Sequence, residues 1–160
     1  DVGVSVRRSG AVVWLKPDCG HGGLMAKVIG GFGEKGLNII ARKMLKVTPD
    51  LAKQHYAEHV AKSFYPGLEK FITASPILAL VVEGLEVIRV VREMLGATSG
   101  LKAAAGTIRG DYSSSRQMNL VHASDGPEAS AREINLYFKP EEILPYEVTL
   151  VGWLKADDEK

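Results

Sequence analysis

The sequence predicts an α+β fold in which helices pack against an antiparallel four-stranded sheet. Two short apolar runs, 11–15 and 77–82, have the length and composition of buried central strands. Around them, helical spacing and strand alternation give the order strand, helix, strand, helical hairpin, strand, helix, long loop, strand, helix. This order is a βαββαβ sandwich with an inserted hairpin and a long loop.

The first half of the chain supplies two strands, a helix and the hairpin. After the strand 11–15, apolar residues spaced for one helix face predict a helix over 24–32. Alternation of apolar and polar residues predicts a strand over 37–47. Two helices then follow, over about 48–59 and 66–74, and they form a helical hairpin that can cover a ligand cleft.

The second half repeats the pattern around a long loop. After the strand 77–82, an amphipathic helix is expected over 85–95. The segment 96–111 is rich in Gly, Ala and Thr, and a loop of this length in a compact domain is usually functional or disordered. A short apolar run that ends at His122 and a helix over 127–138 follow.

Composition favours one globular domain over 1–160, with 147–160 as a C-terminal extension. Hydrophobic residues make up 46% of the chain and charged residues 24%, and the formal net charge of +1 gives no case for obligate nucleic acid binding. No apolar run reaches transmembrane length. The single cysteine fits a reducing compartment, so we expect a cytoplasmic protein. The apolar stretch 148–154 is expected to pack on a neighbouring subunit or back on the sheet.

Two local motifs are expected to carry no chemistry. Residues 31–36 match Gly-x-Gly-x-x-Gly, but the dinucleotide-binding version follows a strand and opens a helix. This one ends a helix, so Gly36 is interpreted as its C-terminal cap. Cys19 and His21 are two potential metal ligands without spaced partners, which is a poor zinc signal.

The segment 119–125, Asn-Leu-Val-His-Ala-Ser-Asp, is the strongest candidate for chemistry. His122 ends a short apolar run, and Ser124 and Asp125 suit a helix N-cap. A neutral imidazole there is a nucleophile near pH 7. Glu133, on the following helix, is placed to orient the ring, with Ser124 orienting that carboxylate in turn. The alternative is a hydrogen-bonded histidine with a structural role only.

Seven blocks in this order resemble the signature of the nucleoside diphosphate kinase family. Each block is weak alone, whereas their ordered occurrence from about 12 to 146 is specific. The blocks are Lys16-Pro17-Asp18, His55-Tyr56, Phe64, 96–98 (Gly-Ala-Thr), 106–111 (Gly-Thr-Ile-Arg-Gly-Asp), 119–125 and 138–142 (Phe-Lys-Pro-Glu-Glu).

The resemblance implies a ferredoxin-like fold and an enzyme that transfers the γ-phosphoryl group from a nucleoside triphosphate to a nucleoside diphosphate. The expected route is ping-pong, through a phosphohistidine on His122, with Glu133 and Ser124 as supporting catalytic residues. Phe64 is expected to stack on the base, with His59 behind it. The implied nucleotide-binding residues are Lys16, Tyr56, Phe64, Arg92, Thr98, Arg109 and Asn119.

The resemblance also implies partners and a cofactor. ATP, ADP, GTP and GDP are the expected nucleotides, and Mg²⁺ is expected to bridge their phosphates without a dedicated protein metal site. A homo-oligomer is expected, with a hexamer favoured over a tetramer. No membrane association is expected.

Some positions depart from the family pattern. Many relatives carry a small apolar residue where Arg116 stands, an arginine at Gly22, and prolines at Gly100 and Ala105. Arg116 can either stack on the base through its guanidinium plane or turn to solvent. These departures keep two alternatives open: an inactive homologue that binds nucleotide or protein, and a purely structural oligomer subunit.

Overall fold

The computed structural model describes residues 9–147, 156, 158 and 159, and contains one four-stranded antiparallel sheet. The strand order is β2-β3-β1-β4, and each neighbouring pair is antiparallel. The predicted fold class is therefore confirmed. The strands are β1 (Ser9–Leu15), β2 (Asn38–Leu45), β3 (Ile77–Gly84) and β4 (Val121–Ala123).

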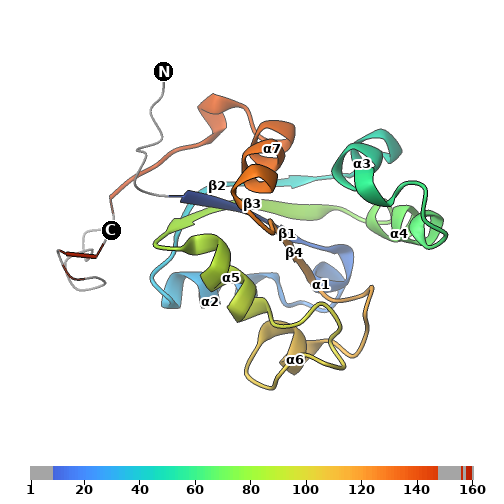
Figure 1. Cartoon of the computed structure of the whole chain (residues 1–160), viewed down its shortest axis with the longest axis horizontal. Coiled ribbons are helices and arrows are strands. Elements are labelled where there is room, and N and C mark those ends of the chain that lie inside the picture. The colour runs from blue at the N-terminus through green and yellow to red at the C-terminus, as the bar shows by residue number, and fades with distance from the viewer. Residues whose placement is uncertain (1–8, 148–155, 157, 160) are drawn as a thin grey trace.

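Helices cover both faces of the sheet, with α7 and α3 on one side and α2 and α5 on the other (Figure 1). Their lengths range from single turns to three turns. The helices are α1 (Pro17–His21), α2 (Met25–Glu34), α3 (Pro49–His55), η1 (Ala57–His59), α4 (Tyr65–Ile72), α5 (Val87–Leu95), α6 (Ile108–Tyr112), α7 (Pro127–Tyr137) and η2 (Pro140–Glu142).

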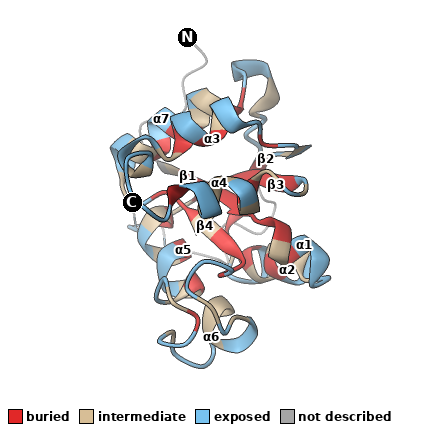
Figure 2. Ribbon diagram, turned by 90° about the vertical axis from the view of Figure 1, so that its right-hand side faces the viewer, coloured by how far each residue is buried: buried red, intermediate tan, exposed pale blue. Residues whose placement is uncertain are grey.

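The continuous apolar runs are explained by burial on two faces. In β3, Leu78, Leu80 and Val82 pack in one core with α2 and α5. The alternate residues Ile77, Ala79 and Val81 pack in a second core, which also contains Trp14 and Tyr137. Figure 2 shows the buried residues concentrated in the strands between the helical layers. Because both faces are covered, the run has no polar alternation.

The short strand β4 is fixed to the start of the chain. It pairs with β1 so that His122 lies opposite Trp14. Leu120, with φ of 72°, precedes it in the left-handed region, which is uncommon for a non-glycine residue. Its N–H donates to Asp18 Oδ2 at 2.8 Å, and its carbonyl accepts from the Lys16 N–H at 2.9 Å. These bonds hold the turn that leads into the histidine strand.

The structure corrects several expectations about local elements. A flexible turn was expected over 19–23, but residues 19–21 belong to the helix α1 (Pro17–His21), in which Pro17 suits the first helical position. The long loop contains α6, whose N-cap Thr107 accepts a hydrogen bond from the Gly110 N–H at 3.0 Å. Ser124 and Asp125 do not cap α7, because the N-cap is Gly126. The Ser124 side chain is buried instead.

Gly36 ends the helix as expected. It follows the C-cap residue Lys35, its φ is 87°, and its N–H donates to the Gly33 carbonyl. The expected packing of 148–154 lies outside the described residues. Within the described part of the chain, no helix combines the length and apolarity needed to cross a bilayer.

Candidate active site

A cleft of about 1610 Å³ lies between the α3–α4 hairpin, the loop before β4 and the start of α7. The structure brings nine of the ten predicted site residues to its walls, and the tenth, Ser124, is buried beneath them. The nine are Lys16, Tyr56, Phe64, Arg92, Thr98, Arg109, Asn119, His122 and Glu133.

His122, Glu133 and Ser124 form a hydrogen-bonded chain in the floor of the cleft. The His122 Nε2 atom lies 3.1 Å from Glu133 Oε1, and the Ser124 hydroxyl donates to Glu133 Oε2 at 2.7 Å. Glu133 is buried, whereas the His122 side chain is 26% exposed. A carboxylate accepts hydrogen bonds, so this arrangement favours the tautomer with hydrogen on Nε2. The Nδ1 lone pair is then available for chemistry.

An aromatic stack supports the histidine from the protein interior. Trp14 and His55 are stacked with ring centroids 4.0 Å apart, and the His55 ring lies edge-on to His122 at 4.5 Å. Burial lowers the pKa of His55 to about 2, so this ring is neutral. The Tyr137 hydroxyl bonds to His55 Nδ1. These ring contacts hold the partly exposed His122 ring against the protein interior.

The cleft carries a concentration of positive charge. Lys16 projects from the end of β1, Arg92 lies on α5 and Arg109 on α6. Burial lowers the pKa of Lys16 to about 8, opposed by Asp18 and reinforced by Arg109. Burial also lowers the pKa of Arg109 to about 10, with a further contribution from Arg92. Three close cations form a site for a polyanion.

Hydrogen bonds from Arg109 hold the wall of the cleft in place. Its guanidinium donates to the carbonyl oxygens of Asn119 at 3.2 Å, Gly96 at 3.0 Å and Val121 at 2.6 Å. The Asn119 side chain connects Lys16 Nζ, at 2.6 Å, with the Thr98 carbonyl, at 2.8 Å. Arg109 therefore braces the histidine strand, with two of its five N–H donors left for a ligand.

The α3–α4 hairpin presents aromatic rings to the other side of the cleft. Phe64 is 51% exposed although it is a large apolar residue. His59 lies behind it, with ring centroids 5.6 Å apart, and Lys62 Nζ lies 5.9 Å from its centroid. Tyr56 packs edge-on against His55, and burial raises the pKa of its hydroxyl, which stays protonated. Phe64 thus offers a flat, accessible face to a planar ligand.

Cys19 and His21, which were not expected to bind zinc, do not line the cleft. Cys19 is a buried free thiol whose pKa is raised to about 12 by burial and by Asp18, and His21 Nε2 bonds to the Ser75 hydroxyl. Among the described residues, the one group of three potential ligands is His55, His122 and Glu133, with ligand atoms within 4.8 Å. We interpret it as the stacked and hydrogen-bonded floor of the cleft.

The structure adds cleft residues that sequence reasoning did not assign to the site, among them Arg132 and Leu68. Arg132 lies beside Glu133, and its Nη1 donates to the Gln54 carbonyl at 3.2 Å. Leu68 lies one helical turn after Phe64. The detectable signal was helical spacing, because a residue one turn from a predicted site residue shares its face.

An accessible imidazole held by a buried carboxylate, in a cleft lined with cations, is an arrangement suited to the class of enzymes that transfer an anionic group through a nucleophilic side chain. The model of the family described as "Nucleoside diphosphate kinase" matches residues 10–143. The chain belongs to the nucleoside diphosphate kinase family.

Similar proteins match more than nine tenths of this chain, at sequence identities from 37% to 61%. A nucleoside diphosphate kinase of Rhodopirellula baltica is 61% identical over 148 residues, covering 92% of this chain and 97% of that protein. The solved Halobacterium salinarum enzyme, in complex with CDP, has a TM-score of 0.90 and 38% identity, covering 92% of this chain and 98% of its own. A Borrelia burgdorferi transition state mimic, with bound vanadate and ADP, has a TM-score of 0.85 and 37% identity, covering 91% and 96%.

These findings confirm the predicted family, its ferredoxin-like fold and its enzymatic activity. The chain is a nucleoside diphosphate kinase that transfers a phosphoryl group between nucleotides. The alternatives of a structural subunit or a binding module are not supported.

Proposed function

We propose that His122 accepts the γ-phosphoryl group of a nucleoside triphosphate and passes it to a nucleoside diphosphate. In the first step, the Nδ1 lone pair forms a bond to the γ-phosphorus, the bond from that phosphorus to the β,γ-bridging oxygen breaks, and the diphosphate leaves with the electron pair. In the second step, a terminal oxygen of another diphosphate attacks the same phosphorus, and the N–P bond breaks. One observation carries the proposal: the His122 side chain is partly exposed to the cleft while its Nε2 is held by Glu133.

Glu133 and Ser124 are proposed as residues that orient His122. The Glu133 carboxylate accepts from Nε2 and so disfavours the tautomer in which Nδ1 carries the hydrogen. It also stabilises the positive charge that develops on the ring when Nδ1 becomes bonded to phosphorus. Ser124 donates to the second carboxylate oxygen and fixes its direction. No proton needs to leave the ring during transfer.

The cations and polar groups of the cleft are proposed to bind the phosphates and ribose. Phosphoryl transfer depends on positioning and charge neutralisation, and Lys16, Arg92 and Arg109 supply the charge. Thr98 is exposed and offers a hydroxyl, and Asn119 offers its amide. The hydroxyl of Tyr56 is proposed to donate a hydrogen bond to the transferred phosphoryl group. It stays protonated because burial raises the pKa of Tyr56.

The accessible ring of Phe64 is proposed to stack on the nucleobase. Every base has a π-face, so stacking alone accepts any base. The Halobacterium salinarum and Borrelia burgdorferi structures hold CDP and ADP respectively. By this similarity we propose nucleoside di- and triphosphates as the substrates, with ATP, ADP, GTP and GDP among them.

Mg²⁺ is proposed as the cofactor, and the donor set of the cleft fits it. Glu58 and Asp125 are exposed carboxylates on its walls. Mg²⁺ typically takes one or two carboxylates together with substrate phosphates and several waters. These two residues would hold it, directly or through water. When bound, the ion would neutralise part of the negative charge on the phosphates.

We also propose one domain over 1–160, with 147–160 as an extension, acting as a cytoplasmic homo-oligomer. The single sheet and the family match over 10–143 support one domain, and the buried free thiol of Cys19 suits a reducing compartment. β2 is an edge strand with Met44 57% exposed, a surface suited to subunit contact. The hexamer, in preference to a tetramer, follows from the family resemblance. Light scattering of the purified protein gives the molar mass of the oligomer and so tests the number of subunits.

Incubation with ATP labelled in the γ-phosphate tests the proposed mechanism. The protein should acquire an acid-labile, alkali-stable label that added CDP removes as labelled CTP. His122→Ala should acquire no label. His21→Ala is the matched control, because His21 is an exposed histidine that bonds to Ser75 and does not line the cleft. Full turnover by His122→Ala would overturn the proposal. Removal of Mg²⁺ with EDTA should abolish labelling until the ion is restored.

A further inference from the structure

We infer that Phe71 is a positioning residue for phosphate binding, because the face of its ring holds the Lys16 ammonium and favours the charged form of this lysine. The Lys16 Nζ atom lies over the Phe71 ring, 5.2 Å from the ring centroid. A cation within about 6 Å of a ring centroid is attracted by the negative face of the ring. The inference deepens the proposed function and rests on the proposal that Lys16 binds nucleotide phosphate.

Lys16 needs this stabilisation because it is buried. The residue is only 5% exposed, and burial lowers its pKa to about 8. Two charged groups also act on it: Asp18 in α1 favours the ammonium, and Arg109 in α6 opposes it. An aliphatic neighbour would exclude water from the ammonium without stabilising its charge. An aromatic face excludes water and attracts the cation as well.

Three uncharged groups contact the Lys16 ammonium. Its Nζ atom donates to the Gln117 carbonyl at 2.7 Å and to Asn119 Oδ1 at 2.6 Å, and the Phe71 ring is the third group. An ammonium has three N–H donors, so the two hydrogen bonds leave one for a phosphate oxygen in the cleft. The ring therefore stabilises the charge without taking the hydrogen bond that a ligand needs.

The contact with Lys16 explains why an aromatic residue stands at this position of α4. Phe71 is partly buried, yet among the described residues neither hydrophobic core includes it, and it does not line the cleft. The next residue, Ile72, is fully buried in the second core. Ile72 thus attaches α4 to the sheet, whereas Phe71 serves the lysine.

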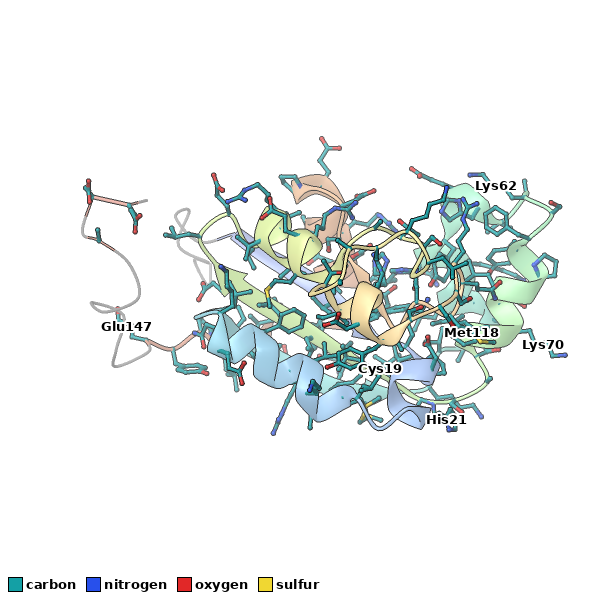
Figure 3. The ribbon with its side chains drawn as sticks, turned by 90° about the horizontal axis from the view of Figure 1, so that it is seen from below. Cys19, His21, Lys62, Lys70, Met118 and Glu147 are labelled. Atoms are coloured by element: carbon teal, nitrogen blue, oxygen red, sulfur yellow. The ribbon has the colours of Figure 1, made fainter. Side chains whose placement is uncertain are left out.

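Helix α4 is connected to the phosphate-binding lysine a second time. Gln117, whose carbonyl accepts from that lysine, also donates from Nε2 to the Gly67 carbonyl at 3.2 Å. Gly67 and Phe71 are four residues apart on α4, so they share one face of the helix. Figure 3 places Met118, the residue after Gln117, at the end of the molecule that also carries Lys70 of α4. One face of α4 therefore holds the lysine both directly and through Gln117.

Replacing Phe71 site-specifically by fluorinated phenylalanines tests the inference while the ring keeps its shape. Fluorine withdraws electrons from the ring face, so each added fluorine weakens the attraction for a cation. In the nucleotide-free full chain, labelled with ¹³C at lysine Cε, NMR follows the titration of Lys16, and Lys16→Met identifies its signal. From phenylalanine to trifluorophenylalanine, the titration midpoint should move stepwise to lower pH, by about one unit in total.

The same shift should appear in nucleotide binding. With trifluorophenylalanine at position 71, the affinity for MgADP at pH 7.5 should be about threefold lower than in the wild type, because a smaller fraction of Lys16 is charged. The difference should nearly vanish near pH 6, where Lys16 is charged in both proteins. Phe71→Leu should act in the same direction, whereas Phe71→Tyr, which keeps the ring, should retain the wild-type midpoint.

The matched control is a second lysine–phenylalanine pair outside the site. Lys43 Nζ lies 5.1 Å from the ring centroid of Phe138, and neither residue lines the cleft. Trifluorophenylalanine at position 138 should change neither the titration midpoint of Lys16 nor the affinity for MgADP.

A Lys16 midpoint that stays constant across the fluorinated series at Phe71 overturns the inference, and so does an equal shift from fluorination of Phe138. The NMR titration needs no nucleotide, so its result is independent of the proposed function. If no nucleoside triphosphate labels His122 of the wild-type protein, the proposed function fails, and the titration series still decides whether the ring stabilises the charge of Lys16.

Discussion

Glu133 Oε1 lies 3.1 Å from His122 Nε2, and the second oxygen of the same carboxylate accepts from Ser124. Eleven positions separate the two residues in the chain. The imidazole is on a strand at the edge of the sheet, and the carboxylate is on a helix that packs against β1. The orientation of the histidine therefore depends on the docking of α7.

Replacing Glu133 by Gln should slow phosphoryl transfer by about 10- to 100-fold. A hydrogen bond to a charged group contributes about 1.5–3 kcal/mol, and 1.4 kcal/mol corresponds to a factor of ten in rate. The loss should be smaller than that of His122→Ala, which removes the nucleophile. Stopped-flow measurement of phosphohistidine formation compares the two. Equal losses in both variants would remove the orienting role of Glu133.

Replacing Ser124 by Ala should lower the free energy of unfolding by about 1–3 kcal/mol. The fully buried hydroxyl donates to Glu133 and accepts from the Val12 N–H at 3.1 Å, so its removal leaves buried partners unsatisfied. Urea denaturation measures the change. The exposed Ser114→Ala should change stability by less than about 0.5 kcal/mol. A neutral effect at Ser124 would contradict the buried network.

Nucleotide affinity should decrease as the pH rises through about 8. Burial lowers the pKa of Lys16 to about 8, so the free enzyme loses this ammonium above that pH, and phosphate must restore the proton in order to gain the ion pair. Affinity for MgADP should fall up to about tenfold between pH 7.5 and 9. Titration calorimetry should show proton uptake above pH 8.

The control for this pH dependence is Lys16→Met. The variant should bind MgADP weakly and with an affinity that does not change between pH 7.5 and 9. Lys102→Met, at an exposed position of the loop, should keep the wild-type pH profile. A wild-type profile in Lys16→Met would assign the titration to another group.

Replacing Phe64 by Ala should weaken the binding of ADP, GDP and CDP by similar factors. Base–aromatic stacking contributes about 1–3 kcal/mol per base, which corresponds to about 5- to 150-fold in affinity. Because stacking does not distinguish bases, the ratio of affinities should change little. Val60→Ala, another exposed apolar position of the hairpin segment, should bind normally. Unchanged affinity in Phe64→Ala would exclude the proposed stacking.

The sequence predicted the architecture because its strongest signals are long-range patterns. The runs 11–15 and 77–82 are buried on both faces, so they contain only apolar residues and are recognised by composition alone. The alternation over 37–47 marks an edge strand with one exposed face, observed as Asn38–Leu45. These patterns predict which residues are buried, and burial shows whether a strand is central or at the edge of the sheet.

Short helices escaped prediction for a physical reason. α1 and α6 have five residues each, which is less than two turns, so no apolar periodicity can develop. Only their first residues carry a signal: Pro17 at the first helical position and Thr107 as an N-cap. The cap of α7 was misplaced because Ser124 is a good cap residue whose side chain has a buried partner instead.

The members of the site were predictable from ordered motifs, but their interactions were not. The order of motifs cannot show that three N–H groups of Arg109 donate hydrogen bonds to carbonyl oxygens, because those bonds depend on the path of the loop. Nor can it show that burial lowers the pKa of Lys16. The Arg109 bonds join residues 10–13 positions apart within one irregular segment, whereas the contacts of Lys16 with Gln117 and Asn119 join segments 101–103 residues apart.

The left-handed turn at Leu120 has a consequence for how the enzyme matures. Its N–H and carbonyl are both bonded to residues 16–18, and β4 pairs with β1 alone. Its partner β1 is made first, and a ribosome must add more than two thirds of the 160 residues before the histidine strand exists to join it. Nascent or truncated forms that end before this segment can fold parts of the sheet, yet they will be catalytically silent.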